Sequence, residues 1–402
     1  MNKEFQPVII GTDINSYNVA RAFHMAHGVV SKVFGNMELI PVKHSKIVDT
    51  TEVEGFYKDD VMVDTLVDYA KANADKDLIL FAASENYVHR IFSNYDILSD
   101  YYIIPYISPD KGLYYSDKMN FYKVCEEKKF PYPKAQSVNR ETYKDAVVDL
   151  DFPLILKPIE SSDYFELNFE GKEKAYILED EVAYEKAIMD IYNHGYGHDM
   201  VLQEFVPGPV TNEYVLNVYS DSKGKVRLLS LGQIILDHPD SALRGNYLAI
   251  ASPEKNEATK KLYKDIQIFL EDIEFKGLAN FDFKWDENHQ TFKVFDFNLR
   301  QGRSSFFSVV AGANYAISVI DDLQDNQRDI IYGDKEFIWL DCTEDFLHET
   351  YAELNPEKYA ELKYIKNVDN TLEYKEDNSF LRKRLIKKYL KNNDERLKNK
   401  LY

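Results

Sequence analysis

The segment 281–307, FDFKWDENHQTFKVFDFNLRQGRSSFF, most constrains what this chain can fold into. Apolar and polar residues alternate on both sides of the polar stretch 286–288, which predicts two half-buried strands joined by a short turn. If the pairing is centred just after that stretch, Asp282 lies opposite Asp296. Asn298 then shares a face with Asp296, because strand side chains repeat every two residues. The sequence therefore predicts a β-hairpin with three oxygen-bearing side chains on one patch.

This patch is a candidate metal site. Two carboxylates directly opposite each other repel unless a cation lies between them, and Mg²⁺ prefers such oxygen ligands together with substrate phosphates. A solvated hairpin face would show the same pattern, so both interpretations stay open at this point. The chain continues into Gly302 and Ser304, where an apolar helix is expected to begin. Its free N–H groups would face the patch and favour an anion.

Length and charge exclude several classes of protein. A chain of 402 residues is too long for one ordinary core and suggests two or three domains. The net charge of −19 argues against general binding of nucleic acid, because phosphate backbones are bound through Lys and Arg. Two distant cysteines, Cys125 and Cys342, make neither a disulfide framework nor a zinc site. With no signal peptide and no long apolar run, a cytoplasmic location is expected.

The first part of the chain has the pattern of an open α/β domain. Apolar strands are expected at 6–10, 46–48 and 78–82, with a helix at 61–71 between the last two. No GxGxxG motif follows the first strand, so a dinucleotide site is not expected there. The polar residues 84–86 follow the carboxyl end of a strand, where open α/β sheets bind ligands. A plain surface loop explains them equally well.

Two lysines occur at positions from which a cation could reach a phosphate. Lys118 lies in the first turn of a predicted helix and points away from its apolar stripe, and Lys157 ends the predicted strand 152–157. Either could also be an ordinary surface residue. Antiparallel strands are expected next, and a helix at 256–272 leads into the hairpin.

The last residues, 380–402, carry nine basic residues against two acidic ones, with apolar residues at roughly helical spacing. We expect a helix that caps the acidic body of the protein. Contact with an anionic membrane is the less favoured alternative, because a polybasic segment binds membranes weakly without a second signal.

These features occur in an order that resembles the ATP-grasp superfamily of carboxylate–amine ligases, over residues 1–332. An α/β domain comes first, followed by two lysines, a Gln-Glu segment, and finally Asp and Asn residues. The resemblance implies ATP as co-substrate and Mg²⁺ as the metal. It assigns ATP contacts to Lys118, Lys157, Gln203, Glu204, Phe205 and Val206, and Mg²⁺ to Asp282, Asp296 and Asn298.

At closer range the chain resembles the D-aspartate ligases of Gram-positive bacteria. The segments that carry this likeness include GTDINSYNVARAF, YSDKMNFYKVCEEKKFPYPK, QEFVPG and, most specifically, FNLRQGRSSFF. Those enzymes join the β-carboxyl of D-aspartate to the lysine side-chain amine of a UDP-linked muramyl pentapeptide, a peptidoglycan precursor. The resemblance therefore implies D-aspartate and this peptide as partners in a ligation reaction.

The arginines after the hairpin suit the chemistry of such a ligase. Arg300 or Arg303, with N–H groups at Gly302, could stabilise a tetrahedral oxyanion, and a guanidinium also matches a substrate carboxylate. A structural ion pair is the alternative for each arginine. Further substrate contacts are assigned to Arg244, Asn246 and Ser304.

Two departures from the family pattern stand out. Asp296 occupies a position where the family usually has Glu, so this ligand is one methylene shorter. The loop 160–164, commonly glycine-rich in the family, has no glycine.

The predicted architecture is α/β, with α+β character in the ATP-grasp part. An N-terminal open α/β pre-ATP-grasp domain is expected at 1–112, a two-subdomain ATP-grasp fold at 113–332, and a C-terminal extension with the basic helix at 333–402. Two other functions stay open: an ATP-grasp ligase with another acid or acceptor, and a nucleotide-binding module without turnover.

Overall fold

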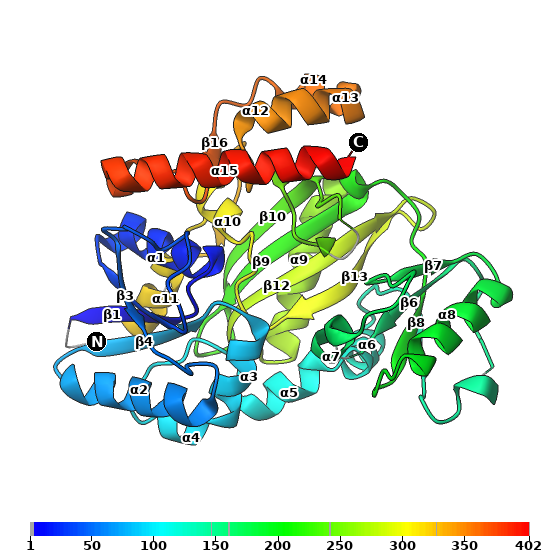
Figure 1. The fold of residues 1–402 in the computed structure, drawn as a ribbon, viewed down its shortest axis with the longest axis horizontal. Helices are drawn as coiled ribbons and strands as arrows, with labels where there is room; N and C mark the ends of the chain where they lie inside the picture. Colours follow the sequence, from blue (N-terminus) through cyan, green and yellow to red (C-terminus); the bar gives the residue numbers. More distant parts are fainter. Residues whose placement is uncertain (1–3, 146, 160, 241–242, 327, 402) are drawn as a thin grey trace.

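The computed structural model describes residues 4–145, 147–159, 161–240, 243–326 and 328–401. Within these ranges the strands form two sheets of four strands and one of eight (Figure 1). Helices and sheets are mixed along the chain, which confirms the expected α/β class.

The N-terminal sheet is parallel throughout and has the strand order β3-β2-β1-β4. Its strands are β1 (Phe5–Ile10), β2 (Ser31–Gly35), β3 (Val48–Glu52) and β4 (Asp77–Ala82). Its helices are α1 (Ile14–His27), α2 (Asp59–Ala72), α3 (Glu85–Ser93) and α4 (Tyr95–Leu98). Strand β2 is short and was not predicted from the sequence, and β3 begins about two residues later than predicted. Because the carboxyl ends of parallel strands share one edge, the residues after β1 and β4 lie near each other.

The second four-stranded sheet is antiparallel, with the order β5-β8-β6-β7. It contains β5 (Ala135–Val138), β6 (Leu154–Pro158), β7 (Tyr176–Leu178) and β8 (Met200–Glu204). Two helices precede it, α5 (Pro109–Ser116) and α6 (Lys118–Glu127), and two belong to it, α7 (Ser161–Glu166) and α8 (Glu181–Asn193). A hydrophobic cluster of its own, which includes Leu154, Tyr164, Ile188 and Leu202, holds this unit together.

The eight-stranded sheet forms the centre of the molecule. Its strands are β9 (Glu213–Ser220), β10 (Val226–Leu236), β11 (Ala249–Ala251), β12 (Gly277–Asp286), β13 (Thr291–Asn298), β14 (Ile331–Tyr332), β15 (Ile338–Leu340) and β16 (Val368–Asn370). The associated helices are α9 (Glu257–Asp272), α10 (Phe306–Val310) and α11 (Tyr315–Leu323). The expected hairpin is therefore confirmed as β12 and β13. Strands β15 and β16 come from beyond residue 332, so the C-terminal segment extends the same sheet.

The C-terminal segment also contains the short helices α12 (Glu344–Phe346), α13 (Ala352–Leu354) and α14 (Pro356–Leu362), and ends in the long helix α15 (Phe380–Leu401). Figure 1 shows α15 lying across the outside of the molecule. Ile386 and Leu390 pack inward, and the buried Arg382 lies 2.9 Å from Asp377 while donating to the carbonyl of Pro41. The basic tail is thus a capping helix, as expected. No helix among the described residues is long and apolar enough to span a membrane.

Candidate active site

One cavity of about 980 Å³ lies where the three sheets meet. Its walls come from the start of α3, the start of α6, strands β6, β8, β12 and β13, and the segment that follows β13. All the site residues predicted from the sequence line it: Lys118, Lys157, Gln203, Glu204, Phe205, Val206, Arg244, Asn246, Asp282, Asp296, Asn298, Arg300, Gly302, Arg303 and Ser304. The chain therefore brings together, from distant segments, the residues to which the resemblance assigns ATP, metal and substrate.

The hairpin pairing places the acidic residues as the alternation predicted. Asp282 is directly paired with Asp296, and the amide of Asn298 donates to Asp282 across 3.4 Å. Beyond this pair the register slips by one residue, because Phe295 is an extra residue that forms a β-bulge. The Phe295 carbonyl, part of the cavity wall, accepts hydrogen bonds from the Tyr122 hydroxyl at 3.0 Å and from Lys157 at 3.4 Å.

The two paired carboxylates have different electrostatic environments. Burial, and then repulsion from Asp296, raise the pKa of Asp282 to about 7, although the Tyr247 hydroxyl donates to it at 2.9 Å. The Asp296 side chain is only half-buried, and the ammonium of Lys118 lies 3.0 Å from its Oδ1. Lys118 and Lys157 together outweigh burial and hold the pKa of Asp296 below its ordinary value.

Lys157 has no carboxylate within ion-pair distance among the described residues. Its ammonium donates to the Tyr122 hydroxyl at 3.3 Å and to the Phe295 carbonyl, both of which are neutral. Burial, followed by repulsion from Lys118, lowers the pKa of Lys157 to about 7. A phosphate group entering the cavity would supply the missing negative charge.

The donor set fits a magnesium nucleotide. In the described part of the chain, no three His, Cys, Asp or Glu side chains cluster as a metal site. The carboxylates of Asp282 and Asp296 and the amide oxygen of Asn298 could hold Mg²⁺ only if other oxygens complete the coordination. Mg²⁺ commonly takes one or two carboxylates plus substrate phosphates, which matches this arrangement. Asp282 and Lys157, which have no ion-pair partner within the described ranges, fit a metal and a phosphate respectively.

The segment 203–206 follows β8 along one wall of the cavity. The Gln203 side chain accepts a hydrogen bond from the Tyr122 hydroxyl at 3.0 Å. The Glu204 carboxylate lies 2.8 Å from Lys293 and accepts from the backbone N–H of Lys134 at 3.1 Å. Protein groups therefore occupy the Glu204 carboxylate, and the N–H groups of Glu204 and Phe205 also donate within the protein, to the carbonyls of Lys134 at 2.8 Å and Pro153 at 3.4 Å.

The two arginines after β13 differ in their surroundings. Arg303 lies 2.7 Å from the buried Asp341 carboxylate, the structural ion pair that the sequence analysis left open as an alternative. Arg300 donates from Nη1 to the Gln301 carbonyl at 2.9 Å, and its buried Nε has no hydrogen-bond partner among the described residues. Arg300 is therefore the arginine with more capacity to bind a substrate carboxylate.

The helix expected at Gly302 and Ser304 begins later than predicted. Helix α10 starts at Phe306 and has five residues, too few for a helix-terminus anion site. The N–H of Ser305 bonds to the Gly302 carbonyl at 3.0 Å, so a tight turn precedes the helix. A Cβ atom at residue 302 would lie 2.9 Å from Asn280, which explains the glycine.

Other sequence-based expectations have mixed outcomes. The three residues expected to contact the substrates, Arg244, Asn246 and Ser304, all line the cavity. Lys174 donates to the Arg244 carbonyl at 2.6 Å, and Ser304 is buried. In the glycine-free stretch, Glu160 lies outside the described residues and α7 follows it.

Sequence reasoning missed several side chains of the cavity and its support. Tyr122 lies four residues after Lys118 on the same helix, a spacing that could have indicated it. Glu85 is in the polar stretch after β4, which the sequence indicated only as a possible ligand loop. Nothing in the local pattern indicates Tyr247 or Lys174, since both lie in connecting segments.

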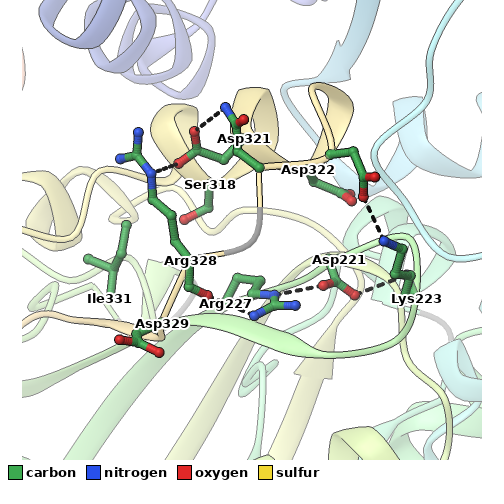
Figure 2. Close-up of a pocket in the computed structure, with 11 residues that line it drawn as sticks. Asp221, Lys223, Arg227, Ser318, Asp321, Asp322, Arg328, Asp329 and Ile331 are labelled. Atoms are coloured by element: carbon green, nitrogen blue, oxygen red, sulfur yellow. Dashed lines mark hydrogen bonds and ion pairs between the residues drawn. The ribbon is translucent and has the colours of Figure 1, made fainter.

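A second pocket, between the β9–β10 turn and the end of α11, is a poor candidate for a ligand site. Its volume is about 20 Å³, roughly one water molecule. Figure 2 shows that its two arginines are already in ion pairs: Arg227 lies 2.6 Å from Asp221, and Arg328 lies 3.0 Å from Asp321.

Solved structures of ATP-grasp enzymes share this fold. The N5-carboxyaminoimidazole synthetase of Staphylococcus aureus, complexed with ADP, matches with a TM-score of 0.64 at 16% identity, over 89% of this chain and 88% of that one. The L-amino acid ligase of Bacillus licheniformis matches with a TM-score of 0.59 at 14% identity, over 81% of this chain and 77% of that one. At such identities the likeness shows the fold alone.

Sequence comparison is more specific. No family model matches the chain. A protein of Enterococcus faecium (strain Aus0004) named D-aspartate ligase is 36% identical over 405 residues, covering 98% of this chain and 95% of that protein. The match extends through both the N-terminal sheet and the C-terminal helix. This chain therefore belongs to the D-aspartate ligase family of ATP-grasp enzymes and is an ATP-dependent carboxylate–amine ligase.

Proposed function

We propose that the protein activates the β-carboxylate of D-aspartate with ATP and joins it to the lysine side-chain amine of a UDP-linked muramyl pentapeptide. The observation that carries this proposal is the cavity's charge arrangement, in which Asp282 on β12 and Lys157 on β6 both lack an ion-pair partner among the described residues. The similarity to a D-aspartate ligase supports the choice of acid. The product would be a peptidoglycan precursor that carries a cross-bridge residue.

The first step transfers the γ-phosphoryl group of ATP to the β-carboxylate and produces an acyl phosphate and ADP. Phosphoryl transfer depends mostly on positioning and on neutralising charge. Asp282, Asp296 and Asn298 would hold Mg²⁺, whose chemistry there would be to offset the negative charge of the phosphates. Lys118 and Lys157 would hold the phosphates. Asp296 would orient Lys118, because their charged groups lie 3.0 Å apart.

The second step is attack by the lysine amine on the acyl carbon. The C–N bond forms, the C–O bond to phosphate breaks, and inorganic phosphate leaves while the amine loses a proton. Arg300, or N–H groups near Gly302, would stabilise the negative oxygen of the tetrahedral intermediate. A guanidinium at Arg300 would also hold the carboxylate of aspartate that does not react. Arg244, Asn246 and Ser304 line the same cavity and would contact the substrates.

The test is ADP release by the purified protein with Mg-ATP, a panel of D- and L-amino acids, and the UDP-linked muramyl pentapeptide present or absent. We expect release only with D-aspartate and the peptide together. ADP release with another acid would support the ligase chemistry and identify a different acid as the substrate. No release with any pair would contradict the proposal and favour a binding module. Asp282→Asn is the matched inactive control, since it keeps the side-chain shape and removes the charge.

A further inference from the structure

Gln301 closes a buried ring of three hydrogen bonds next to the cavity. Its amide Nε2 donates to the Ala82 carbonyl at 2.7 Å. The Ala82 N–H donates to the Tyr106 hydroxyl at 2.9 Å, and this hydroxyl donates back to Gln301 Oε1 at 3.0 Å. Gln301 is 1% exposed, Ala82 is 0% exposed and Tyr106 is 6% exposed. A buried polar group is costly when unpaired, so removing one member leaves the others without partners.

The ring joins two parts of the molecule that are far apart in sequence. Ala82 is the last residue of β4 in the N-terminal sheet, three residues before Glu85, which lines the cavity at the start of α3. Gln301 lies between Arg300 and Gly302, which line the cavity from the other side. The ring therefore fixes the distance between the end of the N-terminal sheet and the segment that carries Arg300.

The segment after β13 is held by side-chain contacts, which besides those of Gln301 include the ion pair of Arg303 with Asp341 and the hydrogen bond that Asn18 donates to the Ser305 hydroxyl at 2.6 Å. Strand pairing ends at Asn298 and α10 begins only at Phe306, so sheet and helix hydrogen bonds do not hold the intervening residues. Arg300 is tied to the same residue, because its Nη1 donates to the Gln301 carbonyl. Its buried Nε has no partner in the described part of the chain. The direction in which the guanidinium points thus depends on where Gln301 is held.

We infer that Gln301 is a positioning residue for the acid substrate. Through its hydrogen bonds to Ala82 and Tyr106, Gln301 holds Arg300 in place relative to the β4–α3 turn. The N-terminal sheet thereby determines the position of the guanidinium that binds the substrate carboxylate. Displacing a substrate-positioning group by about 1 Å can lower the rate about a hundredfold. The inference rests on the proposed function only for the identity of the acid. The nucleotide site, built around Lys118 and Lys157, should not depend on the ring.

The test compares Tyr106→Phe and Gln301→Leu with Tyr102→Phe, measuring KM for the acid, KM for ATP and thermal stability. Tyr102 is a matched control, because its buried hydroxyl donates to the Leu66 carbonyl at 2.7 Å and does not line the cavity. We expect the two ring variants to raise KM for the acid about tenfold or more and to change KM for ATP less than twofold. The control should lose stability without changing either constant.

A conservative variant separates positioning from simple destabilisation. In Gln301→Glu, a protonated carboxyl can still donate to Ala82 and accept from Tyr106, whereas the ionised form cannot donate. The ratio of its KM for the acid to that of the wild type should therefore fall as the pH is lowered. Unchanged KM for the acid in both ring variants, with turnover in the wild type, would overturn this inference alone. Absence of wild-type turnover with every acid would overturn the proposed function as well.

Discussion

Asp282 and Asp296 are directly paired on neighbouring strands, yet in the part of the chain that the structure describes only Asp296 has a cationic partner within ion-pair distance, Lys118 at 3.0 Å. Asp282 is left with the Tyr247 hydroxyl and the amide of Asn298. The result is a pair of carboxylates whose pKa values are moved in opposite directions, with that of Asp282 raised to about 7. This asymmetry makes Asp282 the group that gains most from a bound cation.

Replacing Asp282 should therefore stabilise the ligand-free protein while abolishing turnover. The folded state keeps a proton on Asp282 up to a pH of about 7, whereas the unfolded chain loses it near pH 4. Across that window the carboxylate lowers the free energy of unfolding as the pH rises. Asp282→Asn removes this penalty, so its Tm should exceed that of the wild type at pH 8 by about 2–4 °C, and by less at pH 5. A Tm of Asp282→Asn below that of the wild type at pH 8 would show that the folded protein stabilises the ionised Asp282 carboxylate.

Mg²⁺ affinity should depend on pH through the same group. A metal ligand must be deprotonated, so a proton competes with the metal on Asp282 below a pH of about 7. In the presence of a non-hydrolysable ATP analogue, the apparent affinity should fall by up to about tenfold per unit below that pH and level off above it. Calorimetric titration at pH 5.5, 6.5 and 8 measures this. An apparent Mg²⁺ affinity that does not change with pH would show that Asp282 is not a ligand of the metal.

Nucleotide binding should take up a proton at Lys157. The pKa of this lysine is lowered to about 7 in the ligand-free protein, so at pH 8 much of it is neutral. A polyphosphate beside it favours the charged form and raises the pKa. Calorimetric titration of the protein with nucleotide at pH 8, in two buffers of different ionisation enthalpy, should show proton uptake. This uptake should disappear in Lys157→Arg, because the arginine side chain stays charged. Lys157→Met should weaken binding about a hundredfold, corresponding to the loss of about 2–3 kcal/mol for a charge-assisted contact.

Substitution of Arg303 should affect mainly the stability of the protein, whereas substitution of Arg300 should affect mainly catalysis. Arg303→Ala leaves the buried Asp341 carboxylate without its partner and should lower the free energy of unfolding by about 1–3 kcal/mol. The double variant Arg303→Ala with Asp341→Asn should recover part of that loss. Arg300→Ala breaks no ion pair among the described residues, so it should keep a near wild-type Tm while kcat/KM falls about a hundredfold. Chemical denaturation and steady-state kinetics on the same preparations distinguish the two cases.

The sequence predicted the hairpin well because its alternation and its polar turn are local signals. From those signals follow the pairing of Asp282 with Asp296 and the shared face of Asn298. The position of α10 was predicted wrongly, because Gly302 forms a close approach to Asn280 that only the three-dimensional packing reveals.

Long-range contacts account for most of what the sequence could not indicate. Tyr247 reaches Asp282 from a connecting segment 35 residues earlier, and no local periodicity reports such a contact. The partner of Arg303 is Asp341, beyond the stretch that carries the family resemblance. The β-bulge at Phe295, which turns a carbonyl toward Lys157, also depends on the pairing of strands rather than on residue type.

The most direct test of the central claim is the fate of the carboxylate oxygen. With D-aspartate labelled with ¹⁸O in its β-carboxyl group, Mg-ATP and the UDP-linked muramyl pentapeptide, an acyl phosphate route moves one labelled oxygen into inorganic phosphate. Mass spectrometry of the phosphate should show one ¹⁸O atom for each peptide bond formed, and none in Asp282→Asn. Unlabelled phosphate released together with ligated product would contradict activation of the carboxylate by phosphoryl transfer.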